Sequence, residues 1–279
     1  MMYLDHFGLK EAPFGMTPDT GFIYSGAAFQ EALNTLLVGL GSGEGFIKIT
    51  AEVGTGKTLL CRRFLSTLGD NYVLAYLPNP MLEPRTLLLA IAEEIDLELR
   101  GLDYHFHLIK DLNAHLLKLA AVGKTVVVCL DEAQGMPGES LEALRLLSNL
   151  ETEKRKLMQV VMFGQPELDQ KLAETSARQL RQRIVFHYQM TGLRPQEVQN
   201  YLAHRLRVAG HPSGNLFSPA AAKLVSAYSR GTPRLVNVVA NKSLLTAFGE
   251  GETRIEPAHV RVAGNDTEGA HAVPSWRFW

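Results

Sequence analysis

The sequence is poor in the features that mark secreted, metal-binding or membrane-spanning proteins. Its 279 residues contain only two cysteines, Cys61 and Cys129. Both lie in apolar patterns, which predicts buried small hydrophobic residues rather than a disulfide or a metal-binding pair. No apolar run approaches the ~20 residues that a membrane-spanning helix needs. The first ten residues lack the basic and apolar segments of a secretory signal, so we expect the chain in the cytoplasm.

An excess of positive charge is also missing. The chain has 28 Lys and Arg residues against 29 Asp and Glu residues, a net charge of −1. Net charge therefore gives no indication of non-specific nucleic-acid binding. Apolar residues make up 46% of the sequence, which is typical of a globular protein. The length predicts one large or two modest domains, and the sequence has no internal repeat.

The strongest motif is a glycine-containing loop between an apolar run and a helical pattern. It reads Ala-Glu-Val-Gly-Thr-Gly-Lys-Thr over residues 51–58. Gly54 and Gly56 allow successive backbone N–H groups to point inward around an anion, and the helix that follows adds the positive end of its dipole. We expect Lys57 to reach the β- and γ-phosphates of a nucleotide, and the Thr58 hydroxyl to bind Mg²⁺.

This loop departs from the G-x-x-x-x-G-K-[ST] pattern only at its first position, which is Ala51. Many phosphate-binding loops carry alanine there, so we treat the departure as tolerated. A chance match in a chain of this length has odds of roughly 2 in 100. The predicted nucleotide-binding residues are Ala51, Glu52, Val53, Gly54, Thr55, Gly56, Lys57, Thr58 and Leu59.

Short apolar runs alternate with helical patterns through the first two thirds of the chain. Strands are predicted at 46–50, 72–77, 125–130, 159–163 and 184–188. Helices are predicted at 29–40, 58–68, 84–95, from Asp103 to about 119, at 141–150, and in a piece ending near 180. This alternation implies an α/β fold in which helices cover both faces of a parallel five-stranded sheet, giving three layers.

The strand patterns end after Tyr188. Helices are predicted at 195–209, 219–229, 233–248 and 257–262, with Ser218 as the N-cap of the second. We therefore divide the chain into a nucleotide-binding core (1–190), a small all-helical domain (191–263) and a tail (264–279). Trp276, Phe278 and Trp279 in the tail would either dock on a groove or form a loose end.

Residues 1–25 are rich in turn formers and aromatic residues and have too little periodicity for a helix. We expect this linker to lie over the core. Either Pro13 or Phe14 walls the adenine of the nucleotide, or the segment only packs; both interpretations stay open.

Asp131 and Glu132 directly follow the most apolar strand of the sequence. Packing alone gives no reason to place two carboxylates there. Asp131 is expected to bind Mg²⁺, directly or through a water molecule, and Glu132 to polarise a water molecule in line with the γ-phosphate. The alternative is a pair of solvated carboxylates after a strand.

Amide side chains end two other strands. Gln165 follows the strand at 159–163, which we expect beside the strand that carries Asp131, so its amide could touch the γ-phosphate or the water molecule. The alternative for Gln165 is a loop cap. Asn79 ends the second strand and could hold Glu132 in an inactive orientation.

Two groups of arginines are candidates for contacts with phosphate. Arg178, Arg181 and Arg183 precede the fifth strand, and we select Arg183 as the residue that would serve the nucleotide of a neighbouring subunit. The alternatives are a solvated basic turn and salt bridges to the second domain. Arg234 lies near the start of a helix, where it is unfavourable for the helix dipole, so we predict an external phosphate as its partner. The alternative for Arg234 is an ordinary surface arginine.

Together these residues resemble the AAA+ ATPases, and more closely the branch of the ExeA/GspA (general secretion pathway protein A) secretion ATPases and MshM-type (MSHA pilus biogenesis) proteins. The resemblance runs from residue 3 to about 262 and rests on segments 3–9, 13–14, 17–19, 52–58, 131–134, 164–168 and 231–237. It implies that residues 51–58 are the Walker A loop and residues 126–132 the Walker B segment. It also implies that Gln165 is sensor 1, Arg183 the arginine finger and Arg234 sensor 2.

The resemblance further implies an AAA+ fold with a helical lid, and ATP and Mg²⁺ as cofactors. It implies a homo-oligomer, such as a hexameric ring, with the arginine finger acting in trans. Members support assembly of a type II secretion system or a type IV (MSHA-like) pilus, so the expected partners are inner-membrane assembly proteins, with the chain peripheral at that membrane. Secretion members continue into a membrane span and a peptidoglycan-binding domain. This sequence ends at Trp279 without either, which favours the shorter pilus type.

An alternative function is a DNA-associated ATP switch of the transposition or initiator type. The shared motifs of the branch and the basic residues Arg178, Arg181, Arg183, Arg205 and Arg207 favour it, and the net charge of −1 opposes it. A single-subunit kinase is a weaker alternative, because no motif positions an acceptor and the second domain is all helical.

Overall fold

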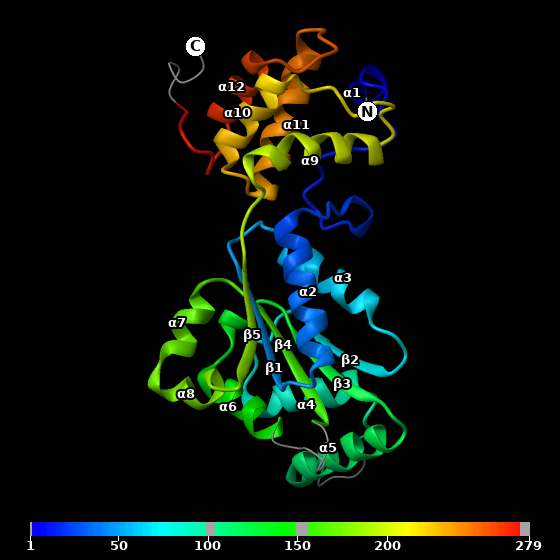
Figure 1. The fold of residues 1–279 in the computed structure, drawn as a ribbon, viewed down its shortest axis with the longest axis vertical. Coiled ribbons are helices and arrows are strands. Elements are labelled where there is room, and N and C mark those ends of the chain that lie inside the picture. Colours follow the sequence, from blue (N-terminus) through cyan, green and yellow to red (C-terminus); the bar gives the residue numbers. More distant parts are fainter. Residues whose placement is uncertain (1, 99–103, 149–155, 274–279) are drawn as a thin grey trace. The chain divides into compact units, whose positions relative to one another are not determined.

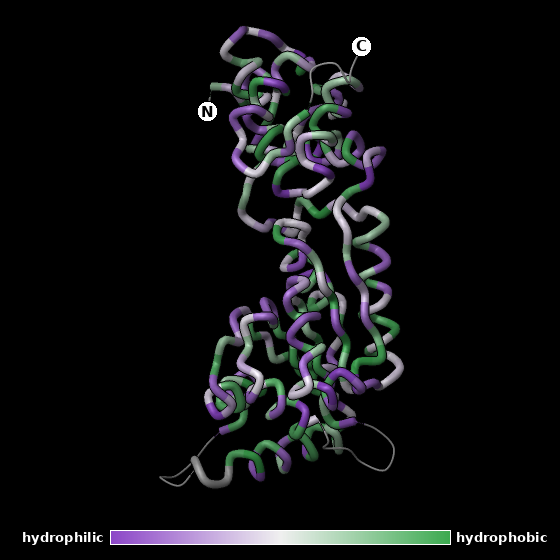
Figure 2. Tube along the Cα trace, turned by 90° about the vertical axis from the view of Figure 1, so that its left-hand side faces the viewer, coloured by the Kyte–Doolittle hydropathy of each residue, from purple (hydrophilic) through white to green (hydrophobic). Residues whose placement is uncertain are grey.

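The computed structural model describes residues 2–98, 104–148 and 156–273 (Figure 1). The chain divides into two compact units. The unit that we call the sheet unit comprises residues 29–53 and 60–190, and the helical unit comprises residues 1–28, 54–59 and 191–279. Hydrophobic stretches of the trace occur in both units, as expected if each has its own core (Figure 2).

The sheet unit is built on five strands in the order β2-β3-β4-β1-β5, and every neighbouring pair is parallel. The strands are β1 (Phe46–Ala51), β2 (Tyr72–Leu77), β3 (Thr125–Leu130), β4 (Met158–Gly164) and β5 (Ile184–Met190). β4 is buried along its whole length and β3 everywhere except its first residue, which explains their unbroken apolar sequences. The predicted parallel five-stranded sheet is confirmed.

Helices cover both faces of this sheet. They are α2 (Ala27–Gly41), α3 (Lys57–Thr67), α4 (Pro84–Glu94), α5 (Tyr104–Ala121), α6 (Gly138–Leu147), α7 (Glu167–Ala173) and α8 (Arg178–Arg181). Side chains of alternate strand residues point to opposite faces. Phe46 accordingly joins the core formed with α4, α5 and α6, while Ile47 packs on the other face against Gly39 of α2. Two features of the predicted helices lie outside the described residues: the end of the helix predicted over 141–150, and Asp103, the predicted N-cap of the helix that runs to about residue 119.

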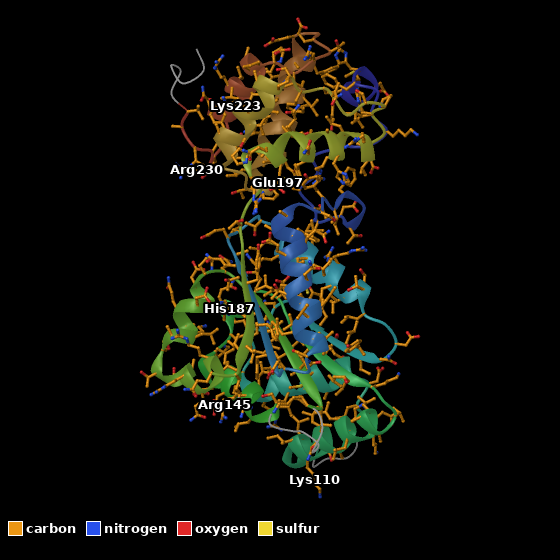
Figure 3. All side chains as sticks on the ribbon, viewed as in Figure 1. Lys110, Arg145, His187, Glu197, Lys223 and Arg230 are labelled. Atoms are coloured by element: carbon orange, nitrogen blue, oxygen red, sulfur yellow. The ribbon has the colours of Figure 1, made fainter. Side chains whose placement is uncertain are left out.

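The helical unit contains α9 (Pro195–Val208), α10 (Pro219–Ser229), α11 (Pro233–Gly249) and α12 (Pro257–Asn265). The predicted N-cap is confirmed, because Ser218 Oγ accepts a hydrogen bond of 3.2 Å from the backbone N–H of Ala221. At the start of α9, the Glu197 carboxylate accepts the backbone N–H groups of Arg194 at 2.8 Å and Ala27 at 2.9 Å (Figure 3). The tail residues Trp276, Phe278 and Trp279 lie outside the described residues.

The N-terminal segment differs from the sequence-based prediction in two respects. Residues Met2–His6 form a short helix, α1, where no helix was predicted. Residues 1–28 also belong to the helical unit, whereas we grouped residues 1–25 with the core. The reason is hydrophobic burial, because Phe7, Phe14 and Phe22 are buried in the same core as α9, α10 and α11. An additional role over the adenine remains a prediction.

None of the helices in the described ranges has the length and apolar character required to span a bilayer.

Candidate functional site

The glycine-containing loop connects β1 to α3, as the sequence predicted. Gly54 and Gly56 have positive φ angles of 79° and 105°, a backbone region that residues with a Cβ rarely occupy. Lys57 is the first residue of α3 and only 5% exposed. A buried cation at the start of a helix after a tight glycine loop fits an anionic group such as a nucleotide phosphate.

Arg234 contacts this loop within the helical unit. Its backbone N–H donates a hydrogen bond of 3.1 Å to the carbonyl of Gly54. A Cβ placed on Gly54 would lie only 2.6 Å from the Cβ of Arg234. The absence of a side chain at Gly54 therefore allows the start of α11 to approach the loop, and it brings two of the predicted site residues together. The Arg234 side chain itself is exposed.

Asp131 and Glu132 follow the carboxyl end of β3. Asp131 is 3% exposed, its N–H donates to the carbonyl of Leu77 at 3.0 Å, and its Oδ1 accepts the N–H of Glu132 at 3.0 Å. Glu132 has a left-handed backbone with φ of 54° and ψ of 38°. Such strain in a residue with a side chain costs about 1–2 kcal/mol and clusters at functional sites.

The Glu132 carboxylate is bound by two amides. Its Oε2 accepts hydrogen bonds from Nε2 of Gln134 at 2.6 Å and from Nε2 of Gln165 at 3.1 Å. Gln165 follows β4, which pairs directly with β3, so the predicted adjacency of these two strand ends is confirmed. The structure therefore brings Glu132 and Gln165 together. Asn79, in contrast, accepts a local hydrogen bond of 3.4 Å from the N–H of Met81 through its Oδ1.

Sequence reasoning assigned no role to Gln134, although it lies in the Asp-Glu-Ala-Gln string. Besides its bond to Glu132, its Oε1 accepts the backbone N–H of Gln165 at 3.0 Å. Lys171 of α7 donates from its Nζ to the carbonyls of Gln134 at 2.6 Å and Met136 at 2.5 Å. A polar side chain two residues after the acidic pair was the available signal for Gln134, whereas no local pattern indicated Lys171.

Arg183 lies at the other end of the sheet from Glu132. It precedes β5, whose first residue Ile184 is aligned with Phe46 at the start of β1. Because the strands are parallel, Arg183 is at their amino ends, and Glu132 and Gln165 follow their carboxyl ends. Arg183 Nη1 donates to Ser148 Oγ at 3.4 Å, so the structure does not bring Arg183 to the acidic pair of its own chain.

A second pair of ionisable side chains lies near Asp131. Cys61 and Cys129 are fully buried free thiols. The hydrogen bond with Cys129, followed by burial, raises the pKa of Cys61. Burial, with smaller contributions from Cys61 and Asp131, raises the pKa of Tyr76 to about 12. The surroundings of Asp131 thus disfavour negative charge on neighbouring groups, as expected for a poorly solvated site.

One of the arginines that favoured a DNA-associated function is structural. Arg205 is 6% exposed, and its Nε donates to the carbonyl of Pro13 at 2.6 Å. Its Nη1 donates to the Tyr201 hydroxyl at 3.0 Å, and its guanidinium lies 4.7 Å from the centre of the Phe22 ring. Arg205 therefore anchors the N-terminal segment, which weakens its predicted role in a nucleic-acid surface.

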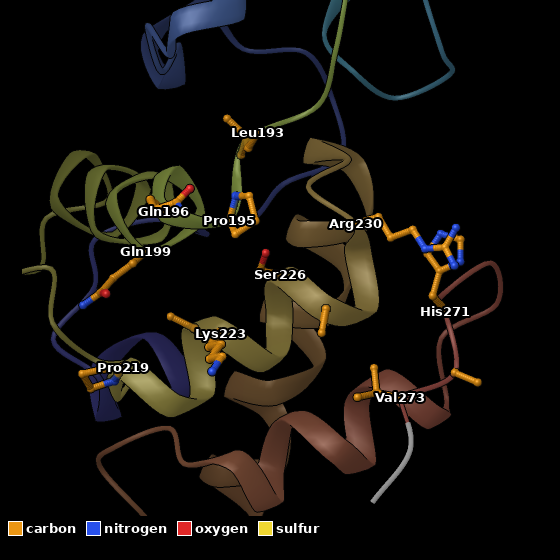
Figure 4. A pocket seen from close by; sticks show the side chains of 13 residues that line it. Leu193, Pro195, Gln196, Gln199, Pro219, Lys223, Ser226, Arg230, His271 and Val273 are labelled. Carbon is orange, nitrogen blue, oxygen red and sulfur yellow. The ribbon is translucent and has the colours of Figure 1, made fainter. Parts of the chain in front are cut away.

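The helical unit also has a pocket of about 730 Å³ beside α9 and α10 (Figure 4). Lys223, Arg230 and His271 line it, and none of the described lining residues is acidic. Arg230 is the C-cap that follows α10 and has a left-handed conformation with φ of 45°. The pocket thus suits an anionic group better than a cation. Its apolar lining comes from Leu193, Pro195, Pro219, Ala222, Ala227, Ala272 and Val273.

Comparisons with known proteins agree with this geometry. The AAA domain family matches residues 40–172. General secretion pathway protein A of Aeromonas hydrophila is 41% identical over 279 residues, which covers 99% of this chain and 50% of that protein. The chain therefore spans about half the length of the curated relative that it matches.

Solved structures share the fold at low sequence identity. The ORC2 protein of Aeropyrum pernix, solved in ADPNP and ADP complexes, has a TM-score of 0.63 at 19% identity over 88% of this chain and 68% of that chain. Cdc6p of Pyrobaculum aerophilum has a TM-score of 0.63 at 20% identity, over 88% of this chain and 70% of that chain. The RuvB branch migration motor of Thermotoga maritima has a TM-score of 0.57 at 16% identity, over 85% of this chain and 67% of that chain. These likenesses confirm the predicted AAA+ fold class.

Proposed function

We propose that this chain, which matches the AAA domain family over residues 40–172 and is 41% identical to general secretion pathway protein A over half of that protein, is a Mg²⁺-dependent ATPase that supports assembly of a type II secretion system or an MSHA-like type IV pilus. The observation that carries the ATPase proposal is the carboxyl edge of the sheet. The phosphate loop follows β1, Asp131 and Glu132 follow β3, and Gln165 follows β4. The bond from Gln165 to Glu132 gives this edge a carboxylate held in one orientation.

In this proposal the backbone of residues 51–59 and the Lys57 ammonium bind the phosphates of ATP. Thr58 and Asp131 would hold Mg²⁺, whose bound charge would neutralise the phosphate oxygens. Glu132 accepts the proton of the attacking water molecule, and Gln165 keeps the carboxylate oriented. Arg234 contacts a phosphate from the start of α11.

Arg183 would act on the ATP of a neighbouring copy. Its position at the amino ends of the strands separates it from Glu132 of its own chain by the length of β5. The proposed assembly is a homo-oligomer, such as a hexameric ring, in which each copy supplies this arginine to the next. Inner-membrane assembly proteins would be its partners, and they would hold it peripherally at the cytoplasmic face of that membrane.

The ATPase proposal is tested by measuring phosphate release from Mg-ATP by the full chain. We expect hydrolysis that EDTA abolishes and added Mg²⁺ restores, and that Lys57→Ala eliminates. We also expect specific activity to rise with protein concentration as copies associate. Specific activity that stays flat over a 100-fold concentration range would contradict the shared site.

The proposed secretion role is supported by the name of the Aeromonas hydrophila relative, and the pilus role rests on the sequence resemblance alone. The genes beside this one provide an independent test. Secretion or pilin and pilus-assembly genes are the expected neighbours, whereas transposase genes would contradict the proposal and favour the DNA-associated alternative.

A further inference from the structure

We propose that Gln134 is a positioning residue that orients the Glu132 carboxylate for hydrolysis, an inference that rests on the ATPase function proposed above. The Gln134 side chain uses both ends of its amide. Nε2 donates to Glu132 Oε2 at 2.6 Å, and Oε1 accepts the backbone N–H of Gln165 at 3.0 Å. The Gln134 amide therefore connects the proposed base, the Glu132 carboxylate after β3, to the backbone of Gln165 after β4.

The surroundings of Gln134 fix this amide in place. The Nζ of Lys171 donates hydrogen bonds to the backbone carbonyls of Gln134 at 2.6 Å and Met136 at 2.5 Å, which restrains the turn that carries Gln134. The Gln134 side chain is half-buried, so its bonds compete little with bulk water.

The need for such a residue follows from the backbone of Glu132. Its left-handed conformation places the carboxylate on a strained turn rather than on a regular helix or strand. Gln165 supplies one hydrogen bond to Oε2 from the neighbouring strand, but at 3.1 Å it is longer than the bond of 2.6 Å from Gln134. Gln134 is therefore the closer of these two amide donors.

The test compares Gln134→Met, which keeps the length of the side chain without its amide, with the matched control Gln170→Met on the exposed surface of α7. We expect Gln134→Met to lower kcat about tenfold while KM and the Kd of a fluorescent ATP analogue stay within twofold of wild type. Gln134→Glu should lower kcat further, because it places a second carboxylate beside Glu132. Gln170→Met should behave as wild type.

Because Gln134 acts through Glu132, a second measurement separates positioning from a structural role. In a Glu132→Gln background, adding Gln134→Met should leave the residual single-turnover rate unchanged. An equal fall in both backgrounds, a rise in kcat, or a loss of nucleotide affinity would overturn the inference. If wild type does not hydrolyse ATP, the proposed function and this inference fail together. If wild type is active and Gln134→Met matches Gln170→Met, only this inference fails.

Discussion

The side-chain amide of Gln165 donates to Oε2 of Glu132 over 3.1 Å, and this bond joins the ends of two neighbouring strands. Val128 of β3 is aligned with Val160 of β4, so the register of the two most buried strands sets the distance between the amide and the carboxylate. The orientation of the proposed base is therefore a property of the sheet as much as of the loop that carries it.

Replacing Glu132 by glutamine should abolish hydrolysis without preventing nucleotide binding. The amide keeps the size of the side chain and cannot accept a proton, so single-turnover hydrolysis should fall by about 100-fold or more. The Kd of a fluorescent ATP analogue should change less than threefold, because the phosphate loop is untouched. Glu174→Gln, on the exposed surface after α7, is the matched control. Hydrolysis near the wild-type rate would remove Glu132 from the proposed mechanism.

Mixing two inactive variants should restore part of the activity if Arg183 acts in trans. β5 has 7 residues. At about 3.3 Å per residue this separates Arg183 by roughly 20 Å from the carboxyl edge that carries Glu132. Lys57→Ala subunits keep the arginine and Arg183→Ala subunits keep the loop, so some mixed interfaces are complete. The control is a mixture of Lys57→Ala and Glu132→Gln subunits. In the proposed site Lys57 and Glu132 come from the same chain and only Arg183 comes from the neighbour. This second mixture therefore contains no complete interface. Equal activity of the two mixtures contradicts the trans assignment.

Gly54→Ala should destabilise the helical unit and weaken nucleotide binding. A left-handed backbone with a Cβ costs about 1–2 kcal/mol. Here that Cβ would also lie 2.6 Å from the Cβ of Arg234. Urea unfolding and titration with a fluorescent ATP analogue measure the two effects. Gly69→Ala is the control, because a Cβ there meets nothing within 4 Å. Equal stability of the two variants would show that the loop tolerates the side chain.

Arg205→Met should lower the free energy of unfolding by about 2–3 kcal/mol, because it leaves the buried carbonyl of Pro13 and the Tyr201 hydroxyl without their charged donor. Arg207→Met, two residues later and exposed, should change it by less than about 0.5 kcal/mol. Urea unfolding followed by circular dichroism gives both values. If the two variants are equally stable, Arg205 does not anchor the N-terminal segment.

Stability should decrease as the pH falls, in part because of His204. Its Nε2 is the buried side-chain atom without a hydrogen-bond partner among the described residues, and burial lowers its pKa. The unfolded chain then binds a proton at a higher pH than the folded chain. The free energy of unfolding is therefore highest above the unfolded pKa of about 6.5 and declines below it. His204→Gln should reduce this decline between pH 7.5 and 5.5, whereas the exposed control His187→Gln should not; equal slopes would contradict the assignment.

Local sequence patterns were sufficient to predict most of the strands and the glycine loop of the sheet unit. The unbroken apolar run before Asp131 predicted a strand buried on both faces, and the glycine loop after β1 has the expected left-handed residues. Those features depend on neighbours in the sequence. The positions of Phe14 and Phe22 depend instead on α9, almost 200 residues away, and no local periodicity encodes that partner. The same limit applies to Lys171, whose hydrogen-bond acceptors are 35 and 37 residues away.

The grouping of residues 1–28 with α9 to α12 has a consequence for biosynthesis. The aromatic side chains of residues 1–28 leave the ribosome well before the helices that bury them are translated. At a translation rate of about 5–20 residues per second, α9 is synthesised roughly 10–40 s after Phe14. The sheet unit, encoded entirely in between, can fold during this interval. Nascent chains thus expose Phe7, Phe14 and Phe22 until α9, α10 and α11 have been translated and can bury them.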